Sequence, residues 1–166
     1  MIEESCRGLT SIDISGNSNM TDVGISYLAQ GCIHLQSINI GGSWSQLTDA
    51  SLAWLRYDRI GESFQGLTSI DMICNSNMTD VGISYLVQGC IHLQSINIGG
   101  LYTQLTDASL AVIGESCGVL TSIDVSDNRK MTDVGISYLA QGCIHLQSIN
   151  IGGSCSQLTD ASLAWL

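Results

Sequence analysis

Basic residues are scarce in this chain, and long apolar segments are missing. Its 166 residues include 5 Lys and Arg against 15 Asp and Glu, so the formal net charge is −10. An acidic surface repels nucleic acid and anionic membranes, so we expect neither as a partner. No apolar run approaches the ~18 residues of a membrane span. The first ten residues, MIEESCRGLT, lack the basic start and the apolar stretch of a signal peptide, which favours a cytoplasmic or nuclear location.

The sequence also lacks the patterns that mark catalytic and metal sites. Its seven cysteines are an odd number and contain no C-x-x-C pair, which favours free thiols over a disulfide framework. No Gly-Lys-Ser or Gly-Lys-Thr sequence follows the Gly-Gly pairs, so these are not phosphate-binding loops. No serine or cysteine is paired with a histidine and an acid in a pattern of nucleophilic catalysis. We therefore expect no enzymatic activity, no cofactor and no metal.

What the chain contains instead is a repeat. The stretch 20–42, MTDVGISYLAQGCIHLQSINIGG, returns unchanged at 131–153. A third copy at 78–100 differs at one position, with Val87 in place of Ala29. A chain that repeats itself this closely is a stack of similar units, and its function is a property of the stack.

The spacing of the leucines defines the module. Leu9, Leu67 and Leu120 lie 58 and 53 residues apart, and the longer step includes an insertion near residues 56–59. Each of these units is itself double, because a second equivalent position follows 26 residues later, as from Leu9 to Leu35. The module is thus 26 or 27 residues long, and six modules form a single domain over residues 1–166.

Each module reads as one strand followed by one helix. In the first, Ile12 and Ile14 alternate with polar residues, the period of a strand with one buried face. Thr21 and Asp22 then offer an N-cap hydroxyl and an acid in the first helical turn. One apolar stripe follows, formed by Ile25, Leu28, Ala29 and Cys32. Because such short elements bury their apolar faces only when stacked, the sequence predicts a curved α/β solenoid with a parallel sheet and an outer helical layer.

The strand pattern resembles a leucine-rich repeat. The signature L-x-x-L-x-L-x-x-N is present as Leu9, Ile12, Ile14 and Asn17, and it returns at 67–75 and 120–128. The continuation, with a Thr-Asp pair, an apolar stripe and a cysteine, is similar to the cysteine-containing subclass. That subclass is best known from F-box/leucine-rich-repeat proteins, the substrate-recognition subunits of ubiquitin ligases. The resemblance implies a sheet on the concave face, helices on the convex face, and protein binding without catalysis.

The alternate modules depart from this signature. Ser43, Leu101 and Ser154 stand where the other modules have Asn, and the loop before Thr-Asp is one residue longer. We therefore expect that no unbroken asparagine ladder runs along the stack.

The cysteines and histidines occupy repeated positions. The apolar stripe is closed by Cys6, Cys32, Cys90, Cys117 and Cys143, with Phe64 at the equivalent position of one module, which favours buried structural thiols over metal ligands. Cys74 and Cys155 fall in strand-exit loops, where we expect more exposure. His34, His92 and His145 share one polar position at the helix-to-strand turn, two modules apart and too distant to share a zinc ion.

The outward positions of the strands form two columns. One is all serine, and its neighbour alternates acid and amide in the order Asp13, Asn39, Asp71, Asn97, Asp124, Asn150. Two interpretations remain open: an acidic, hydrogen-bonding groove for a protein partner with a basic or polar surface, or a solvated face in which Asn dilutes the repulsion between Asp side chains.

The copies differ mainly where the strands leave the sheet. Trp44 and Tyr102 in these loops are candidate anchors for a partner, since aromatic residues concentrate binding energy, or they shield the edge of the core. The insertion adds a second irregularity, because Arg56, Tyr57 and Arg59 form a mixed aromatic and basic patch on the helix side. A neutral surface insertion is the alternative interpretation of that patch.

Neither end of the chain reads as a polar capping module, so we expect either a fragment or ends that stack against another copy, with end-to-end association or aggregation of the isolated chain. Three functions are compatible with these features. The first is a protein-interaction scaffold similar to the recognition part of an F-box/leucine-rich-repeat adaptor. The second is a structural module whose similar units polymerise. The third is an extracellular recognition ectodomain, which requires an upstream signal and glycosylation at Asn19 and Asn77.

Overall fold

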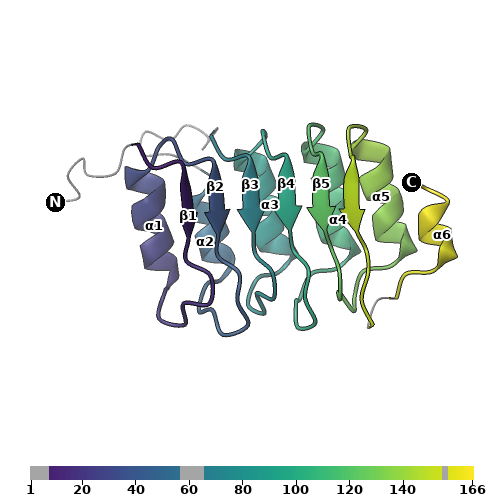
Figure 1. Cartoon of the computed structure of the whole chain (residues 1–166), viewed down its shortest axis with the longest axis horizontal. Coiled ribbons are helices and arrows are strands. Elements are labelled where there is room, and N and C mark those ends of the chain that lie inside the picture. The colour runs from purple at the N-terminus through teal and green to yellow at the C-terminus, as the bar shows by residue number, and fades with distance from the viewer. Residues whose placement is uncertain (1–7, 57–65, 155–156) are drawn as a thin grey trace.

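A computed structural model describes residues 8–56, 66–154 and 157–166. Within these residues, short strands alternate with helices along the whole chain (Figure 1). The strands are β1 (Ser11–Asp13), β2 (Ser37–Asn39), β3 (Ser69–Asp71), β4 (Ser95–Asn97), β5 (Ser122–Asp124) and β6 (Ser148–Asn150). The helices are α1 (Asp22–Gly31), α2 (Asp49–Trp54), α3 (Asp80–Gly89), α4 (Asp107–Ser116), α5 (Asp133–Gly142) and α6 (Asp160–Leu163).

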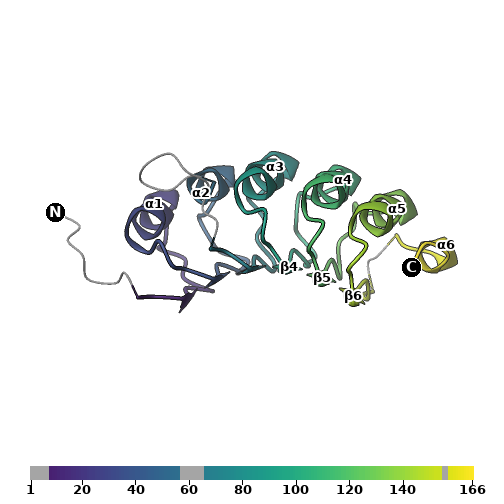
Figure 2. The same ribbon diagram turned by 90° about the horizontal axis from the view of Figure 1, so that it is seen from above.

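The strands form one parallel sheet in chain order, β1 to β6. Each strand pairs in register with the next, so that equivalent residues of all six strands lie in rows across the sheet. Figure 2 shows the helices side by side in a second layer that covers one face of this sheet. The predicted leucine-rich-repeat solenoid of about six modules is confirmed.

The core lies between the two layers. The central isoleucine of each inner strand is 1% exposed, and helix residues such as Ile83 and Leu110 are fully buried against it. Cys32, Cys90, Cys117 and Cys143 complete this core as buried thiols, as predicted. Burial raises the pKa of Cys90 and of Cys117 to about 12, so these thiols stay protonated and inert. Cys74 is half-buried, and Cys6, Phe64 and Cys155 lie outside the described residues.

The helices are locked to one another by a row of aspartates that the sequence reading assigned only to helix caps. Asp80, the first residue of α3, accepts hydrogen bonds from the Thr106 amide at 2.9 Å, the Thr106 hydroxyl at 2.7 Å and the Ser109 hydroxyl at 2.5 Å. Each donor belongs to the next module. The amide and hydroxyl bonds recur at every junction, made by the aspartates 22, 49, 107 and 133.

We call these bonds between the aspartates and the next module the inter-module ladder. Its third bond, from a serine hydroxyl, is present at every second junction. Asp22 and Asp133 accept a further bond from Ser51 and Ser162, as Asp80 does from its serine. Burial acts to raise the pKa of Asp22, but the bonds from Ser51 and Thr48 outweigh it and leave the pKa below its ordinary value. At the other junctions glycine replaces the serine, because a Cβ at Gly82 would collide with the Asp49 carboxylate.

The row of buried asparagines in the strand-exit loops is interrupted in the alternate modules. The residue that takes the place of asparagine is not the one that aligning the modules of this chain indicated. Asn75 and Asn128 are buried, and the side-chain oxygen of Asn75 accepts a bond from the amide two residues later at 3.2 Å. In the module before it, Ser45 is the buried residue that accepts from the amide two residues later, at 3.1 Å. Ser43 is exposed. The pairing of Ser43 with asparagine was therefore wrong, since the longer loop moves the inward position further along the chain.

Candidate functional site

The face of the sheet that the helices leave uncovered is polar. In the inner strands the central isoleucine is buried while the residues on either side of it are half-exposed. The in-register pairing joins the serines into one row and the acid–amide positions into the neighbouring row, as the sequence predicted. Strands lie about 4.8 Å apart, so the aspartates recur about every 10 Å along the face.

The acid–amide row consists of three hydrogen-bonded pairs. In each, the amide nitrogen of an asparagine donates to Oδ2 of the aspartate on the preceding strand. The three bonds are Asn39 to Asp13 at 3.3 Å, Asn97 to Asp71 at 3.0 Å and Asn150 to Asp124 at 2.7 Å. The amides therefore do more than dilute repulsion, because each one holds a carboxylate in a fixed orientation.

The other oxygen of each carboxylate is bound to the strand-exit loop. Asp13 Oδ1 accepts from the Ser15 amide at 2.9 Å, and Asp71 Oδ1 accepts from the Ile73 amide at 2.9 Å. The hydrogen bonds from Ser15, with a smaller contribution from Asn39, hold the pKa of Asp13 below its ordinary value. An ionised carboxylate accepts about four hydrogen bonds, so each aspartate keeps capacity for a donor from a partner.

Aromatic side chains lie along the edge of the sheet beside this row, in the loops that follow β2 and β4. Trp44 is 84% exposed and Tyr102 is 67% exposed. The interpretation that they shield the edge of the core is wrong, because side chains this exposed cover little of it. Ile73 lies in the intervening loop, 39% exposed, and packs toward Gly41. We call these three residues the strand-exit rim. Ile73 was not among the sequence candidates, although it falls in a loop where the copies differ.

The insertion patch does not belong to this surface. Arg56 follows α2 in the helical layer, and its backbone lies where a Cβ on Gly89 would collide with it near the end of α3. Tyr57 and Arg59 lie outside the described residues. The structure thus brings the acid–amide row and the aromatic loops together and leaves Arg56 on the other layer.

The histidines at positions 34, 92 and 145 are exposed at the helix-to-strand turns. Among the residues that the structure describes, no group of three or more His, Cys, Asp or Glu side chains is placed to hold a metal ion. In the same part of the chain, no helix combines the length and the apolar character that crossing a bilayer requires.

Known proteins share this architecture. A sequence model of the family described as Leucine Rich repeat matches residues 5–29 and 117–140. A chain of the Rad7 and Elc1 complex of yeast superposes on 96% of this chain with a TM-score of 0.74 and 19% identity. The leucine-rich repeat-containing protein LegL7 of Legionella pneumophila superposes on 90% of it with a TM-score of 0.57 and 18% identity. This chain spans 39% and 48% of the length of those two chains, and likeness at such identities shows the fold alone.

Proposed function

We propose, from the premise that this chain has the leucine-rich-repeat fold, that it is a non-catalytic scaffold whose sheet face binds another protein. One observation carries this proposal. Three carboxylates are held in a single row by paired amides on the open face of the sheet, and two exposed aromatic residues lie in strand-exit loops along the edge of the sheet beside this row. Exposed aromatic residues are enriched in protein-binding surfaces, and fixed acceptors beside them suit the polar rim of such a contact.

The spacing of the row defines the chemistry of the partner. Carboxylates about 10 Å apart suit lysine or arginine side chains presented by an extended segment or along one face of a helix. The formal net charge of −10 attracts such a partner over longer distances and speeds its association. We expect Trp44 and Tyr102 to contribute the apolar part of the contact.

At a finer level, we propose that the chain corresponds to the substrate-recognition part of an F-box/leucine-rich-repeat ubiquitin-ligase adaptor. Two observations support this assignment. The repeats carry the Thr-Asp pair and the terminal cysteine of the cysteine-containing subclass. The fold is also shared with a chain of the yeast Rad7 and Elc1 complex, a protein that is crystallised with a partner. Finding an F-box in the complete reading frame would test this assignment directly.

A charge-removal series tests the role of the sheet face. Changing Asp13, Asp71 and Asp124 together to Asn should weaken partner binding about 10- to 100-fold, since each exposed charge pair contributes roughly 0.5–1 kcal/mol. The measurement is affinity capture with quantitative mass spectrometry, followed by titration of the captured partner.

The matched control compares single charges. Glu115→Gln removes one charge from an exposed position in α4, in the helical layer, and Asp71→Asn removes one charge from the row. The proposal requires that Asp71→Asn weakens binding and that Glu115→Gln does not. Equal recovery of partners by the triple variant and the wild type would remove the acidic row from the proposed function.

A further inference from the structure

Two features of the open sheet face recur with the same step of two modules. The carboxylates belong to Asp13, Asp71 and Asp124, on β1, β3 and β5, which lie two strands apart in the sheet. The exposed side chains of Trp44 and Tyr102 follow β2 and β4, which are also two strands apart. Because neighbouring strands lie about 4.8 Å apart, both features recur about every 9.6 Å. A partner that contacts both must present its own groups at this interval.

The interval distinguishes between the regular conformations of a bound segment. Along a β-strand the side chains of one face recur about every 6.8 Å, so a strand that meets the outer two aspartates of the row misses the middle one by about 3 Å. An α-helix returns to the same face after seven residues, or about 10.5 Å. A polyproline II helix returns after three residues, or about 9.3 Å. Of the three conformations, polyproline II is closest to the interval of the row.

The curvature of the stack strengthens this distinction. Figure 2 shows the helices on the outer side of the arc and the strands on its inner side. A segment that crosses the sheet face therefore lies inside the arc, where neighbouring modules are closer together than they are in the sheet itself. The interval that the segment must match is thus shorter than about 9.6 Å. Polyproline II meets this requirement at about 9.3 Å, whereas an α-helix exceeds it at every step.

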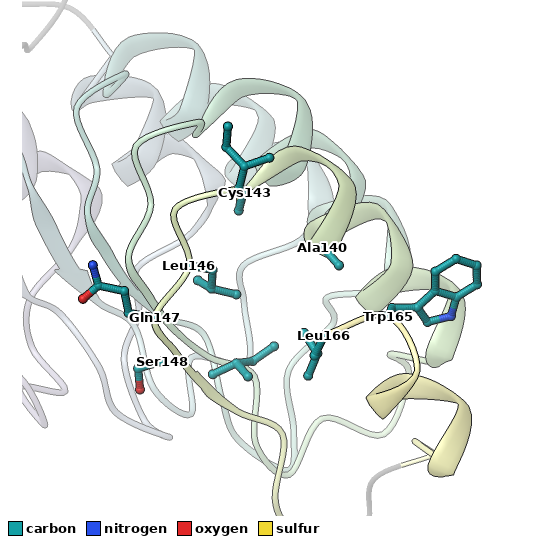
Figure 3. Close-up of a pocket in the computed structure, with 9 residues that line it drawn as sticks. Ala140, Cys143, Leu146, Gln147, Ser148, Trp165 and Leu166 are labelled. Carbon is teal, nitrogen blue, oxygen red and sulfur yellow. The ribbon is translucent and has the colours of Figure 1, made fainter.

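Small side chains leave the carboxylates accessible to such a segment. The neighbouring row is all serine, and in Figure 3, a view of the cavity between α5 and β6, the side chain of Ser148 points away from Leu146. Asp71 Oδ2 accepts one bond from Asn97, and its Oδ1 accepts one from the Ile73 amide. Each oxygen of an ionised carboxylate accepts about two hydrogen bonds. Both oxygens thus keep one position for the paired donors of a guanidinium.

We infer that the sheet face binds an extended polyproline II segment with a lysine or arginine at every third position. The inference rests on the proposed function and names the partner of the same surface. One face of the segment places its basic side chains on the three carboxylates. The residues next to the basic ones face the strand-exit rim, where Trp44, Ile73 and Tyr102 follow consecutive strands. Aromatic surfaces recognise proline in polyproline II segments, so proline suits these positions.

Three synthetic probes test the inference by titration calorimetry with the 166-residue chain. The first is Arg-Pro-Pro repeated three times. The second has the same composition, with its arginines consecutive and followed by the prolines, so only the spacing of charge changes. The third is a helical, alanine-rich peptide with an arginine at every seventh position. The first probe should bind about 10-fold more tightly than either of the others, because it alone places a charge on each carboxylate.

Variants of the chain separate this inference from the proposed function. Changing the three aspartates of the row to Asn should abolish the preference for the first probe. Trp44→Ala combined with Tyr102→Ala should weaken its binding about fivefold, and Glu115→Gln, on α4, should leave it unchanged.

Other outcomes would overturn the inference. If the second or third probe binds as tightly as the first, and still depends on the aspartates, the inference fails while the proposed function stands. Binding of the first probe that is not detectable at about 1 mM would overturn the inference as well. If all three probes bind the triple variant as tightly as the wild type, both the inference and the role of the row fail.

Discussion

Asp80→Ala is expected to lower the free energy of unfolding by about 3 kcal/mol. The carboxylate accepts three hydrogen bonds from the next module, and its loss leaves the fully buried Ser109 hydroxyl without its acceptor. A buried donor without a partner costs about 1–3 kcal/mol, and two further charge-assisted bonds to Thr106 are lost with it. Urea unfolding followed by circular dichroism measures the change.

Asp160→Ala is the matched control for this effect. Asp160 also begins a helix after a threonine, but among the described residues its carboxylate has no hydrogen-bond donor from a following module. Its replacement removes the same favourable charge at a helix N-terminus, which contributes roughly 0.3–1 kcal/mol. A loss of stability at Asp80 no larger than that at Asp160 would contradict the role assigned to the inter-module ladder.

Gly142→Ala is expected to destabilise the stack by about 2–3 kcal/mol, although alanine ordinarily stabilises a helix by about 1 kcal/mol relative to glycine. Gly142 ends α5 where it meets α4, and a Cβ there would overlap the backbone of Gly114. Gly114 in turn faces the Tyr138 carbonyl, 2.6 Å from where its own Cβ would be. Because both neighbours are backbone, only a separation of the two helices relieves the clash.

Gly118→Ala provides the comparison for this substitution. A Cβ at Gly118 would have no heavy atom within 4 Å, so the change should leave the unfolding temperature almost unaltered. Calorimetry of the two variants beside the wild type tests the prediction. An unfolding temperature that rises for Gly142→Ala would show that the two helices are not packed at their glycines.

Much of the fold and of the sheet face could be predicted because the repeat shows which residues are equivalent in each module, and equivalent residues pair across neighbouring strands. Once Leu9, Leu67 and Leu120 are aligned, every outward strand position follows, and with it the row that begins at Asp13. The buried thiols followed from the same alignment, since Cys90 closes the apolar stripe of its helix. Wherever two modules have equal length, the copies within the chain can be compared position by position.

The inward loop residues, the hydrogen bonds between modules and the exposure of the loop aromatics could not be predicted. They depend on how neighbouring modules pack, and the length of the repeat does not determine that packing. The loops after the strands differ in length. Counting residues from the end of the strand therefore made Ser43 the equivalent of asparagine, whereas the side chain that is buried in this loop is that of Ser45. The Thr-Asp pair was visible in every module, but its bonds to the next module depend on how far each helix is displaced from its neighbour. The exposure of Trp44 likewise depends on the course of a loop and not on its composition.

A site-specific photo-crosslinker tests most directly the claim that partners bind the polar sheet face. The crosslinking residue replaces Ser95 in β4 in one variant and Val81, exposed on α3, in the other. Each variant is irradiated with the partner that the wild-type chain captures. The account predicts a covalent adduct from position 95 and none from position 81. Adducts formed from position 81 and absent at position 95 would contradict it.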